Sequence, residues 1–154
     1  MKVLKSALFF SLLALLLMPY MPAQQPERIL VHAHRGGRAL RPENTIAAFE
    51  YAISTGADVL ELDLGVTKDN VVVSHDSVLN PPICTGPKPN AAIRSLTLSE
   101  LKQWDCGSTR NPQFERQQTV PGQRVPTLDE VFALRRAASS NSTSKRRSIR
   151  GSRS

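Results

Sequence analysis

Residues 29–66 hold a short apolar run, a helical pattern and a second apolar run, and this order constrains the fold more than any other feature. The runs Ile29–Ala33 and Val59–Val66 have the length of buried strands. Between them, Ile46, Phe49 and Ile53 recur at spacings of three and four, which predicts a helix with one buried face. Strand, helix and strand in this order predict a parallel βαβ unit and therefore an α/β protein.

Residues typical of turns bound these elements. Asn44 is the expected N-cap of the helix, and Gly56 is the expected residue just beyond its end. Lys68–Asn70 predicts a hairpin turn that leads into a third strand, Val71–Val73, which ends at His75. Because functional side chains gather at the carboxyl ends of strands in α/β proteins, we expect these ends to share one rim.

The segment after the third strand is expected to be rich in loops. Residues 77–95 contain four prolines and predict a loop. Thr97 with Glu100, and Thr127 with Glu130, match the capping-box pattern that opens a helix. The apolar residues expected on these two short helices are Leu101, Trp104, Leu128, Val131, Phe132 and Leu134.

The first 23 residues have the pattern of a secretory signal peptide. Lys2 and Lys5 precede the largely apolar run Ala7–Leu17, whose eleven residues are too few for a stable transmembrane helix. Cleavage is expected before Gln24, so the mature protein is expected to be secreted or periplasmic, without a membrane span. An uncleaved membrane anchor is the alternative.

Cys84 and Cys106 are the two cysteines of the chain. Outside the reducing cytosol they could form one disulfide, which would close a loop of about 22 residues and stabilise the fold by about 3 kcal/mol. A zinc site is less favoured, because the sequence has no CxxC or HxxxH spacing.

The net charge of +7 comes from the C-terminal end of the chain. Residues 135–154 hold seven Lys or Arg and no Asp or Glu, so the remaining residues are balanced in charge. This tail has Ile149 as its one large aliphatic residue and is expected to be disordered. Specific nucleic-acid binding is therefore not expected, although the tail could attract nucleic acid without regard to sequence. The expected organisation is a signal peptide (1–23), a folded domain (24–134) and a basic tail (135–154).

Glu61 and Asp63 stand two residues apart on an expected strand. The two-residue period of a strand would place both carboxylates on one face. Two carboxylates on one face repel each other unless a cation lies between them, and oxygen ligands suit Mg²⁺ or Ca²⁺. The pair therefore predicts a metal site, with a solvated strand face as the alternative.

His34 and His75 each close an expected strand. A pair of imidazoles can supply an acid and a base near neutral pH, although a structural role is the alternative for each. Arg35 adds a planar cation suited to a phosphate oxygen, and Gly36 and Gly37 would let backbone N–H groups approach an anion. Together with a metal, these groups predict phosphoryl chemistry on an ester.

The same residues lie within motifs that resemble the glycerophosphodiester phosphodiesterase family. The resemblance runs from about residue 29 to residue 134, and its motifs occur in the family's order. They are His34–Gly37, Pro42–Thr45, Gly56–Asp58, Glu61–Asp63, Thr67–Asp69, Val73–Asp76 and Val125–Val131.

This resemblance implies a TIM-barrel hydrolase that cuts glycerophosphodiesters to glycerol 3-phosphate and an alcohol, using a divalent metal such as Mg²⁺ or Ca²⁺. By position, His34 and His75 would be the general acid–base pair. Glu61 and Asp63 would bind the metal, and Arg35 would contact the substrate phosphate. Glu43 lies in a family motif, but we assign it no ligand role.

The chain departs from the family after the second capping box. The family's third acidic metal ligand follows that helix in a Glu-x-Lys pattern, and here the basic tail stands in its place. A complete barrel needs roughly 200 to 250 residues, so we expect only the N-terminal portion of a TIM barrel. A reading-frame change or early stop would explain the tail, with an evolved basic tail as the alternative. Two functions stay open, a phosphodiesterase and a non-catalytic fragment or module that binds phosphate headgroups.

Overall fold

A computed structural model describes residues 28–134 and residue 137. The predicted signal peptide, residues 1–23, lies outside the described residues, and so does the predicted tail except for residue 137. Within the described part of the chain, no helix is long and apolar enough to cross a membrane.

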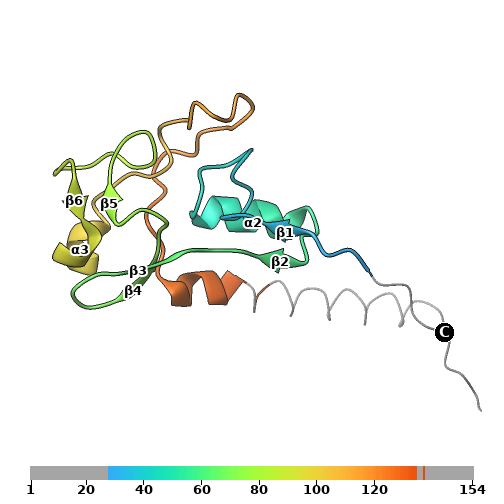
Figure 1. Cartoon of the computed structure of the whole chain (residues 1–154), viewed down its shortest axis with the longest axis horizontal. Coiled ribbons are helices and arrows are strands. Elements are labelled where there is room, and N and C mark those ends of the chain that lie inside the picture. Colours follow the sequence, from blue (N-terminus) through green and yellow to red (C-terminus); the bar gives the residue numbers. More distant parts are fainter. Residues whose placement is uncertain (1–27, 135–136, 138–154) are drawn as a thin grey trace, which may run out of the picture.

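The predicted βαβ unit is confirmed (Figure 1). Strand β1 (His32–Ala33) is followed by helix α2 (Ile46–Ser54) and strand β2 (Val59–Leu60). The two strands are parallel, with His32 opposite Val59. The buried face of α2 includes Phe49, which packs with Val73 and Val131 in one of two core clusters.

The predicted N-cap of α2 is wrong by one residue. Thr45, not Asn44, is the N-cap, and its side chain accepts a hydrogen bond from the N–H of Ala48. Asn44 has a φ of 54°, in the left-handed region, and its side-chain amide instead donates to Asp63. Gly56 follows the helix with a φ of 82°, as predicted, because a left-handed residue here ends the helix without strain at a Cβ.

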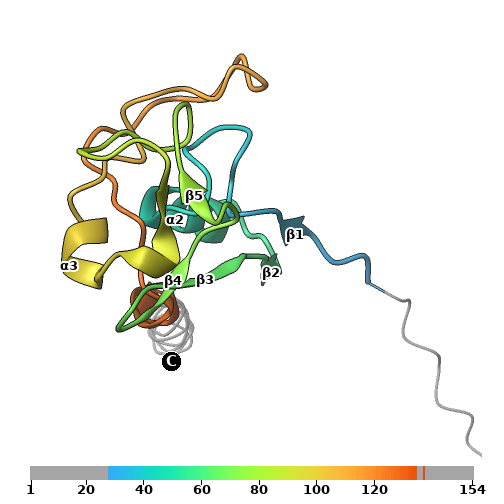
Figure 2. The same cartoon turned by 60° about the vertical axis from the view of Figure 1, so that its left-hand side comes forward.

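The first predicted strand is shorter and less buried than expected. Of Ile29–Ala33, only the last two residues are in β1, and Ile29 is 90% exposed. Figure 2 shows this part of the chain running away from the body of the molecule. The backbone of Val31 is nonetheless bonded to Asp58 and Val59, so the segment still lies along the start of β2.

The second predicted strand, Val59–Val66, is two strands with a break between them. The backbone of Glu61 bonds to Ala33 on one side, whereas Asp63 bonds to Ser74 on the other. The chain thus changes its pairing partner within residues 61–63. After the break, β3 (Leu64–Val66) pairs antiparallel with β4 (Val71–Val73), which confirms the predicted hairpin.

The proline-rich segment is more ordered than predicted. Strand β5 (Val78–Leu79) pairs antiparallel with β6 (Ala91–Ala92), and a 3₁₀ turn, η1 (Ile93–Ser95), follows. Helix α3 (Leu98–Leu101) then begins with the predicted capping box. It ends before Trp104, which is only 1% exposed and belongs to the larger core cluster.

Cys84 and Cys106 form a disulfide, with both side chains buried in the larger core cluster. The bond joins the loop after β5 to the segment after α3. The backbones of Thr85 and Asp105 also bond to each other beside it. The predicted disulfide is therefore present, and it ties together two segments that have little regular structure.

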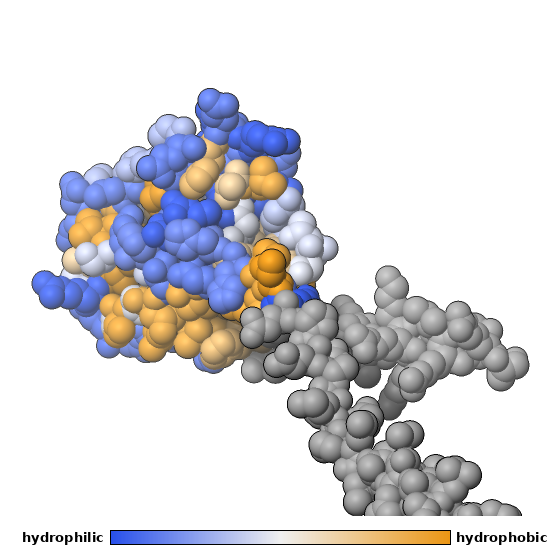
Figure 3. Space-filling model, turned by 45° about the vertical axis from the view of Figure 1, so that its right-hand side comes forward, coloured by the Kyte–Doolittle hydropathy of each residue, from blue (hydrophilic) through white to orange (hydrophobic). Residues whose placement is uncertain are grey.

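Residues 128–134 are helical and follow the second predicted capping box, in which Thr127 and Glu130 bond reciprocally. Val131 is buried, but Phe132 is 49% exposed, because it points away from the face that packs on the core. Leu64 and Val66 of β3 are also exposed. Figure 3 shows apolar surface gathered on one part of the face that it presents.

Candidate active site

Arg35 lies at the centre of a cluster of three acidic side chains. Its backbone N–H donates to Glu61 Oε2 at 2.7 Å. Its guanidinium contacts Glu43 Oε1 through Nη1 at 2.7 Å and Asp63 Oδ2 through Nε at 3.2 Å. The Arg35 side chain is only 13% exposed, so these charges interact with little screening by water. The predicted phosphate ligand therefore sits against both predicted metal ligands.

Glu43 has a structural role in this cluster that the sequence analysis did not assign. Its side chain is 4% exposed, and its second oxygen lies 2.9 Å from Arg38 Nη2. Each carboxylate oxygen thus faces a different guanidinium, and Glu43 holds Arg35 and Arg38 together. The sequence did hold a signal for this role, because Glu43 stands just before the helix expected to be buried. A carboxylate that becomes buried there needs a cationic partner.

Glu61 and Asp63 are brought together by Arg35 and not by the period of a strand, since they lie in the break between β2 and β3. Their side chains are 39% and 28% exposed. The contacts described above use one oxygen of each carboxylate, Oε2 of Glu61 and Oδ2 of Asp63. The donor set suits a hard divalent cation, but the described residues contain no group of three His, Cys, Asp or Glu placed to hold one.

Of the two predicted catalytic histidines, His34 contacts one acidic and one basic residue, and His75 contacts one acidic residue. His34 Nε2 lies 3.9 Å from Glu61 Oε2, and its Nδ1 lies 3.4 Å from Arg38 Nη1. His75 Nδ1 lies 2.7 Å from Asp76 Oδ1. Both rings are about half exposed, which suits groups that exchange protons with a substrate.

The hairpin explains how His75 reaches this region. We expected the ends of the three strands to share one rim, and the predicted hairpin makes β4 antiparallel to β3. The end of β4 therefore lies beside the start of β3, and the Ser74 N–H donates to the Asp63 carbonyl at 3.1 Å. The antiparallel hairpin, and not a parallel crossover, therefore places His75 near the acidic residues.

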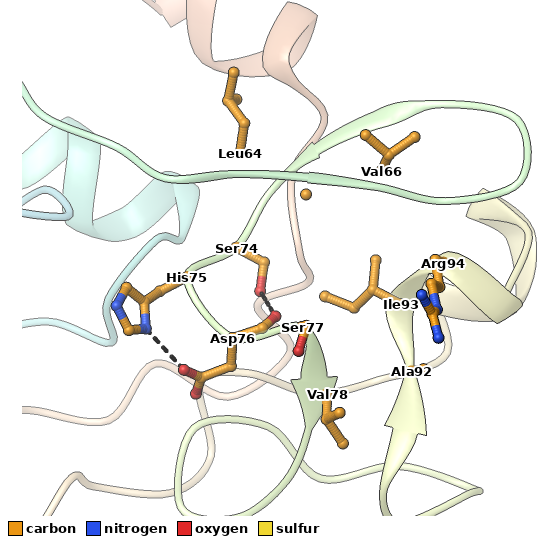
Figure 4. A pocket seen from close by; sticks show the side chains of 11 residues that line it. Leu64, Val66, Ser74, His75, Asp76, Ser77, Val78, Ala92, Ile93 and Arg94 are labelled. Carbon is orange, nitrogen blue, oxygen red and sulfur yellow. Dashed lines mark hydrogen bonds and ion pairs between the residues drawn. The ribbon is translucent and has the colours of Figure 1, made fainter.

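Two cavities meet at His75 and Asp76. One, of about 410 Å³, is also lined by Arg35, Arg38 and Glu43. The other, of about 450 Å³, is shown in Figure 4 and is lined by apolar residues of β3, β5 and η1. In Figure 4 the His75 ring points away from those apolar side chains.

The expected anion-binding role of Gly36 and Gly37 is wrong in this structure. The N–H of Gly36 donates to Ala33, and the N–H of Gly37 donates to Ala48, so both are already used. A Cβ on Gly36 would lie 2.8 Å from the Ala48 backbone, and the residue has a φ of 75°. The glycines therefore let this loop pack closely against α2.

Comparison with known proteins identifies the family. The model of the glycerophosphoryl diester phosphodiesterase family matches residues 34–148. The chain belongs to this family. It is 41% identical over 108 residues to the glycerophosphodiester phosphodiesterase of Caldanaerobacter subterraneus, covering 70% of this chain and 40% of that protein. It is 42% identical over 103 residues to the mouse lysophospholipase D GDPD1, covering 65% and 31%.

Solved structures of this family have the same fold. A glycerophosphodiester phosphodiesterase from Agrobacterium tumefaciens gives a TM-score of 0.60 at 28% identity, covering 72% of this chain and 44% of that one. A phosphodiesterase from Oleispira antarctica, in complex with the product sn-glycerol-3-phosphate, gives 0.58 at 30% identity, covering 71% and 41%. The described fold is therefore part of a TIM barrel, as predicted, and the chain spans less than half the length of these relatives.

Proposed function

We propose that this protein is a metal-dependent hydrolase of glycerophosphodiesters, releasing glycerol 3-phosphate and an alcohol. The observation that carries the proposal is the contact of Arg35 with Glu61 and Asp63, in a cluster whose arginine shares a cavity with His75. The match to the family model and the product complex of the Oleispira relative support it.

In this proposal each residue keeps the role that its chemistry suits. Arg35 binds a phosphoryl oxygen, since Glu43 and Asp63 hold its guanidinium in one orientation. Glu61 and Asp63 would hold a divalent ion such as Mg²⁺ or Ca²⁺, which neutralises negative charge on the phosphoryl oxygens when bound.

His34 and His75 would be the acid–base pair. One imidazole removes a proton from the attacking hydroxyl, which is a glycerol hydroxyl of the substrate or a water. The other gives a proton to the oxygen of the leaving alcohol. Their half-exposed rings, the contact of His34 with Glu61 and the cavity that His75 shares with Arg35 support these roles.

A second candidate function is binding of phosphorylated headgroups without turnover. It is favoured by the donor set of the described residues, in which no group of three His, Cys, Asp or Glu is placed to hold a metal ion. In this case Arg35 would bind the phosphate, and the histidines would contribute hydrogen bonds only.

We also propose that the protein acts outside the cytosol. The Cys84–Cys106 disulfide supports this location, because such bonds persist in oxidising compartments. The signal-peptide pattern of residues 1–23 supports it as well.

Incubating the full chain with glycerophosphocholine and Mg²⁺ or Ca²⁺, and measuring glycerol 3-phosphate, tests the proposal. Release that His34→Ala abolishes and His32→Ala preserves would support the hydrolase, since His32 is an exposed residue of the same segment. Binding of sn-glycerol-3-phosphate without release would favour the binding module. If neither occurs, both functions are wrong for this chain.

A further inference from the structure

The two histidines of the candidate site have opposite partners at Nδ1. His75 Nδ1 faces a carboxylate oxygen of Asp76 at 2.7 Å, which accepts hydrogen bonds. His34 Nδ1 faces the guanidinium of Arg38 at 3.4 Å, which can only donate them. The difference concerns the one proton of a neutral imidazole ring, which lies on either Nδ1 or Nε2.

The contact with Asp76 favours one position for that proton on His75. A carboxylate oxygen accepts hydrogen bonds, so the short contact favours a proton on Nδ1, which leaves Nε2 as a free acceptor. At His34 the donating guanidinium does not favour a proton on Nδ1. Of the two rings, His75 is therefore the one whose Nε2 is prepared to accept a proton.

The backbone around Asp76 holds this arrangement in place. The Ser74 hydroxyl donates to the carbonyl of Asp76 at 3.0 Å, and the Ser74 N–H donates to the carbonyl of Asp63. His75 and Asp76 also line the cavity that contains Arg35. The backbone of this segment is thus bonded to Asp63, and the His75–Asp76 contact, drawn in Figure 4, borders the cavity where a phosphate would meet Arg35.

We propose that Asp76 is a positioning residue that makes His75 the proton acceptor of the reaction. This inference rests on the proposed hydrolase function. The attacking oxygen loses its proton to His75 Nε2 as it bonds to phosphorus, and the bond from phosphorus to the leaving oxygen breaks. That oxygen takes its proton from His34. The resulting imidazolium of His75 keeps its Nδ1–H on Asp76, whose carboxylate balances the new positive charge.

Long-range ¹H–¹⁵N correlation spectra of the ¹⁵N-labelled full chain test the proposal without any need for turnover. At a pH where the ring is neutral, His75 should carry its proton on Nδ1. In Asp76→Ala this preference should be lost, and in Asp129→Ala, an exposed acid on another element, it should persist. A proton on Nε2 of His75 in the unaltered protein would overturn the proposal, and so would an unchanged preference in Asp76→Ala.

Kinetics separate this inference from the proposed function. If the chain is active, Asp76→Asn should lower kcat by about 100-fold or more with little change in KM, since the carboxylate acts through His75 and not on bound substrate. An unchanged kcat in that variant would contradict the role of Asp76 in catalysis. An inactive chain with the expected His75 tautomer would refute the hydrolase while leaving the positioning contact established.

Discussion

Glu43 Oε1 and Arg35 Nη1 lie 2.7 Å apart, and the Glu43 side chain is almost completely removed from solvent. The two residues flank a loop of successive turns. Arg38, which lies within this loop, contacts the other Glu43 oxygen at 2.9 Å. One buried acid thus pairs with two arginines at the point where the candidate site is assembled.

Replacing Glu43 should strongly destabilise the protein. Glu43→Ala would remove the carboxylate that two poorly solvated guanidiniums share, and breaking a buried ion pair costs about 3 to 5 kcal/mol. Urea unfolding of the full chain measures this loss. Lys102→Met is the matched control, since it breaks the more exposed Lys102–Glu130 pair and should cost at most about 1 kcal/mol. Equal losses in the two variants would mean that burial of Glu43 has no energetic importance.

Asp105 should make stability fall in acid. Burial raises its pKa, but N–H groups of Gly107, Gly122 and Ser108 donate to its carboxylate and together hold the pKa below its ordinary value of 3.8. Because the folded pKa is depressed, the stabilisation is complete above the unfolded pKa and is lost as the pH falls through the folded value.

The variant Asp105→Asn tests this dependence. At pH 7 it should be less stable than the unaltered protein by about 1 to 3 kcal/mol, since it weakens the acceptor for three backbone donors. The difference in the free energy of unfolding between the two proteins should narrow as the pH is lowered below 3.8, where Asp105 itself becomes protonated. Urea midpoints measured from pH 7 to pH 2 would show this convergence, and a gap of constant size would contradict the role of the Asp105 charge.

Gly107 should tolerate no side chain. A Cβ there would lie 1.9 Å from the carbonyl oxygen of Val120, whose N–H is bonded to the Gly107 carbonyl at 2.8 Å. The two backbones cannot separate without losing that bond, so Gly107→Ala should cost about 1 to 3 kcal/mol or more. Gly65→Ala is the control, because its Cβ would meet nothing closer than 3.6 Å. Thermal unfolding of both variants would decide the matter, and equal melting temperatures would show that the loop relaxes freely.

Divalent cations should bind weakly. Two carboxylates, Glu61 and Asp63, are present where the sequence resemblance implies three acidic ligands, and each already contacts Arg35. Calorimetric titration with Mg²⁺ or Ca²⁺ should give an affinity weaker than micromolar, and Glu61→Gln should abolish the heat of binding. A micromolar affinity in the unaltered chain would show that the site has a further ligand.

Local signals in the sequence predicted the starts of the last two helices and the end of α2. The capping boxes at Thr97 and Thr127 and the glycine after α2 act within one helical turn, so they can be recognised without knowledge of the rest of the fold. Asn44 was misassigned because Asp63, 19 residues away, competes for its side chain. No local pattern reports a partner at that distance.

The sequence predicted which residues lie together in the candidate site, but only part of how the fold brings them together. His34, Arg35 and the two acids could be named from residue type and spacing. The parallel ends of β1 and β2 bring Arg35 to Glu61 as expected, but Glu61 and Asp63 do not lie on one continuous strand. The break after β2 and the return of β4 place Asp63 and His75, and both depend on which strand each segment pairs with. Glu43 was assigned no role because its role depends on its burial between two arginines. That burial follows from tertiary packing and cannot be recognised in the local sequence.

The β3–β4 hairpin also limits how this region can vary among related sequences. Its pairing sets Leu64 opposite Val73, and alternate residues face opposite sides. Removing a single residue from β4 would move Val72 from the larger core cluster to the side on which Val73 packs with Phe49. Length differences among homologues should therefore fall in the turn and not in the strands, and a one-residue gap within residues 64–66 or 71–73 would mark a misaligned sequence.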